Sequence, residues 1–197
     1  MTIKDKKISQ IIQSATQEFL VKGLDAASMH NIAELAGVSK RTLYKYFPNK
    51  DELYSALIDE LLDRVFENKQ DYCQEKTIKE QLEQIVKNKI DLFSSESFIN
   101  MSKIILGEML KSRKPTEQQL ERMYQTELLF VNWVNEAKKD NKVTSTLDNE
   151  TIANQFHAIL KGQTFYPVIF YFAETANIDK QHVLDTTVEF FINSFCR

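Results

Sequence analysis

Glycine and proline are scarce in this chain, and this scarcity limits its possible folds more than any other feature of the sequence. The 197 residues include four glycines and three prolines. Because those two residues supply most of the turns that hairpins need, the chain has room for long helices and almost none for β-hairpins. Apolar residues also recur at helical spacing through most of the sequence, which predicts an all-α fold.

Start and stop signals divide the chain into about nine predicted helices. Gly23 ends the first helix, Ser28 and Ser39 can cap the second and third, and Gly37 permits a positive-φ turn between those two. Pro167 kinks or ends the eighth helix, since its ring removes one intrahelical hydrogen bond. The expected helices cover residues 6–22, 28–36, 39–47, 49–68, 78–93, 98–109, 115–137, 148–167 and 179–195.

Charge is distributed unevenly between the two ends of the chain. Residues 1–50 hold eight Lys or Arg against four acids, whereas the whole chain has a net charge of −3. The screening length in physiological salt is about 8 Å, so a basic segment can attract a polyanion although the whole chain is acidic. The N-terminal segment therefore suits a nucleic-acid partner.

The stretch 33–50, AELAGVSKRTLYKYFPNK, has the pattern of a helix-turn-helix unit. In such a unit the second helix enters the major groove with its N-terminal residues against the base edges. Leu43 and Phe47, four residues apart, point inward and hold this helix on its scaffold. Lys40, Arg41 and Thr42 form its first turn, and their side chains suit hydrogen bonds to guanine or contact with a thymine methyl group. We expect these three to read bases.

Other residues of this segment suit phosphate contacts, which fix register without reading sequence. Lys50 is the most informative, because a cation in the first turn of a helix opposes the helix dipole, whereas a phosphate bound there would explain it. Ser28 starts a helix with similar geometry. The alternative for Lys50 is a solvated lysine without a ligand, and the alternative for Ser28 is an ordinary helix cap. The predicted phosphate contacts are Ser28, Ser39, Tyr44, Lys45, Tyr46 and Lys50.

A specific set of residues in the first 55 positions matches a known family. The set is Gly23, Ala26, Ser28, Ile32, Ala33, Ala36-Gly37-Val38-Ser39, Thr42-Leu43-Tyr44, Tyr46-Phe47, Asn49-Lys50 and Leu53. It resembles the N-terminal signature of the TetR family of bacterial transcriptional regulators. Arg41 departs from it, since many members have glycine or a small residue there. The segment LKGQTFYPVIFYF, followed by a helix ending EFFINSF, further resembles the C-terminal domain of the AefR-like and AcrR-like branch.

This resemblance implies a homodimer of all-helical subunits and a palindromic operator, with repression relieved by a small molecule bound to the C-terminal domain. The expected domains are a three-helix DNA-binding domain at 1–49 and a helical ligand-binding and dimerisation domain at 50–197. Control would work by population shift, because a bound ligand would change the separation of the two recognition helices.

The eighth and last predicted helices are apolar on more than one side, which suggests that each contacts both its own core and a partner. Gly162 would allow close helix approach, or it is a tolerated helix glycine. The sequence leaves open which apolar face of each helix packs on its own core and which contacts the partner. The predicted dimer interface is Ile159, Gly162, Gln163, Leu184, Val188, Phe191, Ile192 and Phe195.

A ligand cavity in the C-terminal domain needs apolar and aromatic lining with a few polar groups. His157 could orient a polar ligand atom, or it is a satisfied core or surface histidine. The other candidates could equally be plain core residues. The predicted pocket is Phe98, Met101, Ile105, Met123, Phe130, Trp133, Phe156, His157 and Tyr166.

Several classes of protein find no support in the sequence. No His, Cys, Asp or Glu cluster has metal-ligand spacing, no nucleophile and base form a catalytic pattern, and no cofactor is expected. Cys73 and Cys196 are expected as free thiols. With no signal peptide and no run of about 20 apolar residues, we expect a cytoplasmic protein without membrane contact, at the nucleoid when bound to its operator.

The function expected from these features is that of a homodimeric repressor, released from DNA by a small, largely apolar effector. Two alternatives are also compatible with the sequence: an activator of the same family, and a helical small-molecule-binding protein whose DNA-binding domain is not functional. An enzyme on a helical body is a third, but it would need a catalytic constellation that the sequence lacks.

Overall fold

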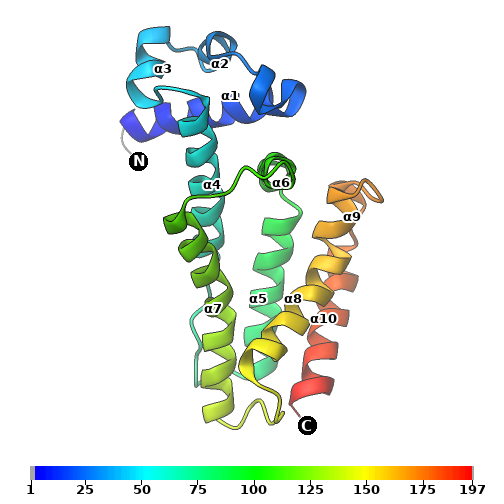
Figure 1. Ribbon diagram of the computed structural model, residues 1–197. Helices are drawn as coiled ribbons and strands as arrows, with labels where there is room; N and C mark the ends of the chain where they lie inside the picture. The colour runs from blue at the N-terminus through cyan, green and yellow to red at the C-terminus, as the bar shows by residue number, and fades with distance from the viewer. Residues whose placement is uncertain (1–2, 197) are drawn as a thin grey trace. The chain divides into compact units, whose positions relative to one another are not determined.

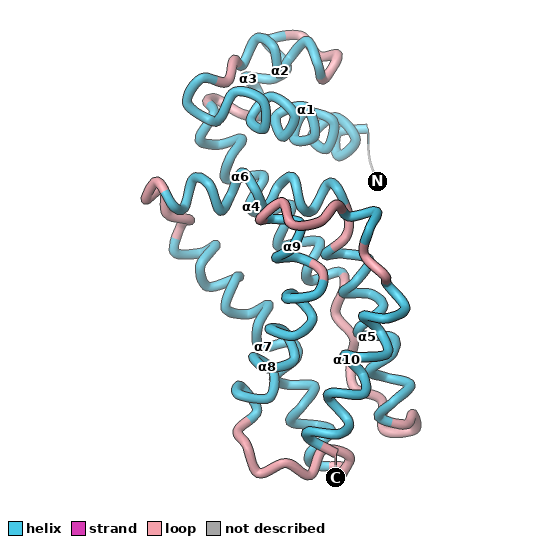
Figure 2. The backbone as a smooth tube through the Cα atoms, turned by 90° about the vertical axis from the view of Figure 1, so that its right-hand side faces the viewer, coloured by secondary structure: helices cyan, strands magenta, loops and turns pink. Residues whose placement is uncertain are grey.

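The computed structural model describes residues 3–196, and within that range the chain forms ten α-helices, one 3₁₀ turn and no β-strand (Figures 1 and 2). The predicted all-α fold is confirmed. The elements are α1 Ile3–Ala26, α2 Met29–Leu35, α3 Lys40–Tyr46, α4 Lys50–Glu67, α5 Ile78–Phe93, α6 Glu96–Leu110, α7 Glu117–Lys139, α8 Asn149–Gln163, α9 Phe165–Ile169, η1 Thr175–Asn177 and α10 Lys180–Phe195.

The chain forms two compact units. The first comprises Met1–Leu61 and Asn100–Leu120, and the second comprises Leu62–Ile99 and Glu121–Arg197. Helices α4, α6 and α7 each contribute residues to both units. The division into domains at 1–49 and 50–197 stays a prediction.

In the first unit, α1, α2 and α3 pack around a small apolar core. Ile11, Ile32 and Leu43 have no exposed side-chain surface there. Gly23 interrupts α1 with φ 73° and ψ 163°, so the predicted stop at this glycine is confirmed, and one further turn reaches Ala26. Gly37 has φ 62° and makes the turn between α2 and α3, a conformation that a residue with a Cβ resists.

In the second unit, α10 packs between α5 and α8 (Figures 1 and 2). An aromatic stack fills the core between α7, α8 and α10. The Phe130 ring stacks on Phe156 with centroids 4.1 Å apart and on Trp133 at 5.2 Å, and the Phe191 ring meets Phe156 edge-on at 5.9 Å. Offset and edge-on ring pairs of this kind add stability beyond the burial of apolar area.

The expected eighth helix is two helices, which raises the count from about nine to ten. Pro167 has no N–H to bond Gln163, and α8 ends at that residue. Thr164 follows as the C-cap, fully buried, and its hydroxyl donates to the carbonyl oxygen of Leu160 at 2.7 Å. The short α9 then contains Pro167 itself.

Candidate functional site

The helix-turn-helix predicted at 33–50 is formed by α2, the turn at Gly37 and α3. Ser39 caps α3: its hydroxyl accepts from the backbone N–H of Thr42 at 3.1 Å and lies 2.8 Å from the Thr42 hydroxyl. Ser28 caps α2 in the same way through the N–H of Asn31 at 3.5 Å. Both predicted caps are confirmed, so each serine hydroxyl already has a partner within the chain.

Helix α3 presents one buried face and one exposed face. Leu43 is fully buried and Phe47 is 8% exposed, so both hold the helix on its scaffold as predicted. The opposite face carries four exposed side chains: Lys40, Arg41, Tyr44 and Lys45. This face presents three cations and a phenol to solvent.

Two predicted contact residues on α3 are less accessible. Thr42 and Tyr46 are half-buried, and the Thr42 hydroxyl is turned toward Ser39. The ammonium group of Lys45 lies 5.8 Å from the centre of the Tyr46 ring, within range of a cation–π contact. The base-reading and phosphate roles assigned to these residues stay predictions.

Lys50 has a partner inside the chain. It is half-buried, and its Nζ donates a hydrogen bond to the backbone carbonyl of Asp25, at the end of α1. This bond ties the start of α4 to the end of α1. It explains the position of the lysine without a phosphate, although a lysine ammonium has two further protons to donate.

Glu18 is a buried residue of the first unit that the sequence analysis missed. Its Oε1 accepts from the N–H of Ser28 at 3.0 Å and from Asn31 at 3.4 Å, and it pairs with Lys22 at 3.0 Å. Burial acts to raise the pKa of Glu18, but Lys22, Ser28 and Asn31 together lower it. The carboxylate thereby fixes the start of α2. The i, i+4 spacing of Glu18 and Lys22 was the only signal for it.

Arg113, in the loop between α6 and α7, is a second such residue. Its guanidinium contacts three carboxylates of the first unit: Nε lies 3.2 Å from the buried Glu108, Nη2 lies 3.1 Å from Asp25, and Nη1 pairs with Asp51. The arginine joins α6 to the end of α1 and the start of α4. Sequence spacing gives no sign of this, because the partners lie up to 88 residues away.

Three further hydrogen bonds of the first unit involve α4. The hydroxyl of Tyr54 donates to the carbonyl of Ile105 on α6 at 3.5 Å. Nε2 of Gln119 donates to the carbonyl of Ser55 at 3.0 Å and contacts its hydroxyl at 2.9 Å. Gln119 also completes the predicted capping pair with Thr116. The start of α7 is therefore fixed to α4.

The predicted pocket residues fall into different environments. Met101 and Ile105 are buried in the first unit. Of the rest, Phe98 and Phe156 are buried among other rings, Met123 is half-buried, and Tyr166 is 44% exposed on α9. Trp133 lines two adjoining hollows in the second unit, one of about 190 Å³ and one of about 30 Å³, and Phe130 lines the smaller one. The two hollows share Lys69, Gln70, Leu129 and Trp133.

His157 is 7% exposed on α8 and sits in a charged group of side chains. Its Nδ1 lies 3.4 Å from Glu127 Oε2 but outside hydrogen-bond geometry, and neither ring nitrogen has a hydrogen-bond partner within residues 3–196. Burial lowers the pKa of His157, which keeps the ring neutral at pH 7. The His157 contact, together with Lys161 and Lys89, lowers the pKa of Glu127.

The predicted dimer residues separate into a core set and a surface set. Val188, Phe191 and Phe195 are at most 4% exposed within the subunit, because this side of α10 packs against α5 and α8. Ile159, Gln163, Leu184 and Ile192 are half-buried and Gly162 is exposed. The dimer interface stays a prediction for all eight residues.

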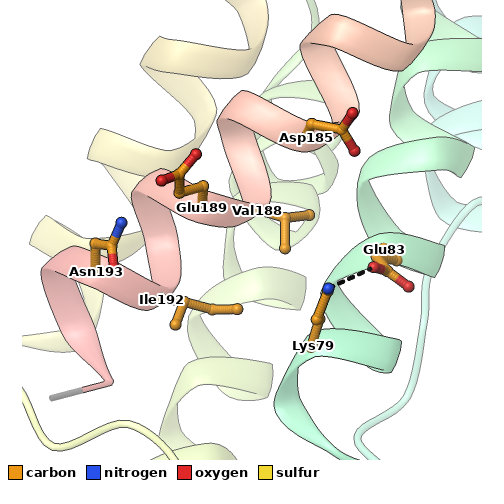
Figure 3. Close-up of a pocket in the computed structure, with 7 residues that line it drawn as sticks. All are labelled: Lys79, Glu83, Asp185, Val188, Glu189, Ile192 and Asn193. Atoms are coloured by element: carbon orange, nitrogen blue, oxygen red, sulfur yellow. Dashed lines mark ion pairs between the residues drawn. The ribbon is translucent and has the colours of Figure 1, made fainter.

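An open groove of about 350 Å³ runs between α5 and α10 (Figure 3). Val188 and Ile192 point into it toward α5, where Lys79 and Glu83 form an ion pair at 3.8 Å. Asp185, Glu189 and Asn193 complete the lining. The groove has exposed carboxylates at its edge and offers no buried polar group, so it has no feature that orients a ligand.

Within residues 3–196, no three His, Cys, Asp or Glu side chains come together in a way that could hold a metal ion. In the same range, every helix is too short or too polar to cross a membrane. Cys73 and Cys196 are free thiols, as expected.

Family models match both parts of the chain. Residues 11–57 match the model described as bacterial regulatory proteins, tetR family. Residues 80–197 match the AefR-like transcriptional repressor, C-terminal domain. The chain belongs to the TetR family. The fold, with its helix-turn-helix and C-terminal helical domain, is the TetR fold, and the resemblance seen in the sequence is confirmed.

Individual relatives of this TetR-family chain are similar over short stretches. The HTH-type transcriptional activator FasR of Mycolicibacterium smegmatis is 39% identical over 62 residues, 32% of this chain and 28% of that protein. The HTH-type transcriptional regulator TtgR of Pseudomonas putida is 43% identical over 53 residues, 27% of this chain and 25% of that protein. The matches thus span under a third of these curated relatives.

One solved structure covers nearly the whole chain. A TetR family transcriptional regulator from Pseudomonas syringae pv. tomato aligns with a TM-score of 0.75 and 28% identity over 98% of each chain. The helical C-terminal part of the fold is therefore shared with a known member of the family.

Proposed function

We propose that this chain is a homodimeric, ligand-responsive repressor that binds a palindromic DNA operator and is released by a small, largely apolar effector. Residues 1–49 would bind DNA, and residues 50–197 would bind the effector and the second subunit. The proposal places the protein in the bacterial cytoplasm, at the nucleoid when bound, and includes no enzymatic activity.

The observation that carries the proposal is the division of α3 into two faces. Leu43 and Phe47 are buried, whereas Lys40, Arg41 and Lys45 are exposed on the other side. A helix that follows a tight turn and presents cations in its first turn fits the geometry by which a recognition helix enters the major groove. Two such helices, about 34 Å apart, would meet successive major grooves on one face of the operator.

Control by an effector is supported by the contacts of Arg113 and Gln119. These side chains join α6 and the start of α7 to α1 and α4 within the first unit. A ligand that favours one position of α6 would change the position of α4 through them. Release of DNA then requires the effector to bind the released state more tightly by a few kcal/mol.

Repression is favoured over activation by the C-terminal match. The AefR-like model, described as that of a repressor, spans residues 80–197, whereas the match to the activator FasR spans 62 residues. The alternative of a ligand-binding protein with a non-functional DNA head is disfavoured by the three exposed cations on α3, which have no other evident role.

A gel-shift titration of the purified protein on the DNA flanking its own gene tests the proposal. We expect a dimer to bind one or more palindromic sites there, with an affinity that falls steeply with salt. Binding that is equal for all DNA sequences, or no binding at low salt, would contradict it. A reporter gene under that promoter separates the repressor from the activator, since deletion of the regulator raises expression in the first case and lowers it in the second.

A further inference from the structure

The two hollows beside Trp133 form a small site within the second unit. The larger is lined by the segment after α4, including Tyr72, and by one face of α7. The smaller continues toward α5 and is lined by Lys89, Phe130 and Trp133 among others. Their volumes, about 190 Å³ and 30 Å³, lie below the roughly 300 Å³ at the lower end for drug-sized ligands. The site therefore suits a small molecule.

Two hydrogen-bond donors in this site have no acceptor. Trp133 is 3% exposed, and its Nε1–H has no partner within residues 3–196. Lys89 is half-buried and makes no hydrogen bond or ion pair with any residue in that range, but its Nζ is not among the fully buried polar atoms. Buried polar groups in proteins are nearly always paired, so the unpaired N–H of Trp133 is the unusual one, and indole and ammonium groups can only donate. What the site lacks is an acceptor.

The carboxylates that line the larger hollow already have partners: Asp71 lies 3.5 Å from Lys69 Nζ and Glu136 lies 2.7 Å from Lys139 Nζ. Beside Lys89 the charges are less balanced. Glu127 acts on both Lys89 and Lys161, and its Oε1 lies 3.9 Å from Lys161 Nζ. His157 is neutral beside them. Burial, and then the neighbouring Lys161, lower the pKa of Lys89 to about 8, so its charge is unfavourable where it is. One negative charge brought into the site would balance the second lysine.

We propose that the effector is a small organic acid whose carboxylate accepts hydrogen bonds from Lys89 and Trp133 and whose apolar body packs against Trp133 and Tyr72. The inference rests on the proposed function for the existence of an effector and adds its chemical class. Phe130 supplies an apolar wall in the smaller hollow. An ammonium and an indole N–H around one carboxylate would satisfy all three groups.

Matched acids and amides test this inference on the full-length protein. Trp133 is the chain's single tryptophan, so its fluorescence reports on this site. We would titrate benzoate against benzamide and hexanoate against hexanamide, by fluorescence and by calorimetry. We expect at least one acid to bind at millimolar concentration or below, and its amide to bind about ten- to hundredfold more weakly, the effect of losing a charge-assisted hydrogen bond.

Three variants locate the binding. Lys89→Met should lower the affinity for the acid by the same ten- to hundredfold. Trp133→Phe, measured by calorimetry, should also lower this affinity while keeping an aromatic ring in place. Lys87→Met is the matched control, because Lys87 is exposed on the same helix. It should bind like the parent. Thermal melts followed by circular dichroism would show that each variant folds.

The inference is overturned if no acid binds, if an amide binds as tightly as its acid, or if Lys89→Met binds acids as the parent does. Its failure is distinct from failure of the proposed function. A protein that binds its operator but takes amides as well as acids would contradict the inference alone. A protein that binds acids through Lys89 but has no specific DNA affinity would contradict the proposed repressor and retain the site.

Discussion

Nη2 of Arg113 lies 3.1 Å from Oδ1 of Asp25, and this ion pair joins a loop after α6 to the end of α1. The same guanidinium contacts Glu108, whose side chain is 5% exposed. Because a buried carboxylate is costly without a cation, Arg113 and Lys111, whose Nζ lies 2.8 Å from the other carboxylate oxygen, together neutralise Glu108. Arg113 at the same time fixes the helix-turn-helix to α6.

Replacing Arg113 should therefore lower stability. We expect Arg113→Met to reduce the free energy of unfolding by about 1–3 kcal/mol, measured by urea denaturation, because Glu108 loses a charged partner. Lys114→Met, an exposed neighbour, is the control and should have little effect. Adding Glu108→Gln to Arg113→Met should restore part of the loss. A double variant that is less stable than Arg113→Met would refute this account.

Glu18 gives a prediction that depends on pH. Glu18→Gln should lower the free energy of unfolding by about 1–3 kcal/mol at pH 7, since the carboxylate accepts from Ser28 and Asn31 and pairs with Lys22. The pKa of Glu18 is lowered by folding, so its contribution is complete above its usual value of 4.5 and is lost as pH falls through the folded value. Urea titrations from pH 3 to 7 should show the difference between parent and variant shrinking toward the acid end; a constant difference would argue against an ionised Glu18.

The exposed face of α3 predicts two different kinds of DNA-binding variant. Lys45→Ala should weaken binding to all sequences about equally and reduce the salt slope by about one, as expected for one lost phosphate contact. Arg41→Ala should instead change the preference among operator variants, by about 1–3 kcal/mol at one base pair. Fluorescence anisotropy across a salt series and a panel of operator mutants would measure both. Identical behaviour of the two variants would contradict the division of roles.

Lys50 tests whether one lysine has both a structural and a DNA-binding role. Its hydrogen bond to the carbonyl of Asp25 predicts that Lys50→Met loses about 0.5–1.5 kcal/mol of stability. If Lys50 also contacts a phosphate, the salt slope of DNA binding falls by about one as well. We expect both effects. A loss of stability with an unchanged salt slope would leave Lys50 a purely structural residue.

Lys89 predicts stability that rises at alkaline pH. Folding lowers the pKa of Lys89 from its usual 10.5 to about 8, mainly by burial and then through Lys161, against the opposing charge of Glu127. Between these two values the unfolded chain binds more protons than the folded one, so the contribution of this group to stability increases with pH across that interval. We would measure urea midpoints at pH 7.5 and 9.5. The stability of the parent relative to Lys89→Met should be higher at pH 9.5, where Lys89 is neutral in the folded chain, whereas the difference between the parent and Lys87→Met should stay constant.

Local signals in the sequence were enough to predict most of the helices and several of their ends, but not the division of 148–167 into α8 and α9. Caps at Ser28 and Ser39, the turn at Gly37 and the break near Pro167 depend on residues within a few positions of one another, so a linear sequence displays them. The same holds for the inward pair Leu43 and Phe47.

Contacts between distant segments could not be predicted. Arg113 and Asp25 are 88 residues apart, and no periodicity signals their pairing. The sequence analysis did not single out Lys89, because only the folded chain brings it to the same hollow as Phe130 and Trp133 of α7. The sequence also left open which apolar faces of the last helix are covered by its own core, because an apolar helix face does not say which neighbour covers it; Val188, Phe191 and Phe195 are buried within the subunit.

The two-faced construction of α3 has an evolutionary consequence. Leu43 and Phe47 carry the packing of this helix, while Lys40, Arg41 and Lys45 contribute nothing to the core. Mutations at the outward positions can therefore change which operator is recognised without a penalty in folding. A duplicated copy of this gene could acquire a new set of target promoters one surface substitution at a time, and keep a working scaffold at every step.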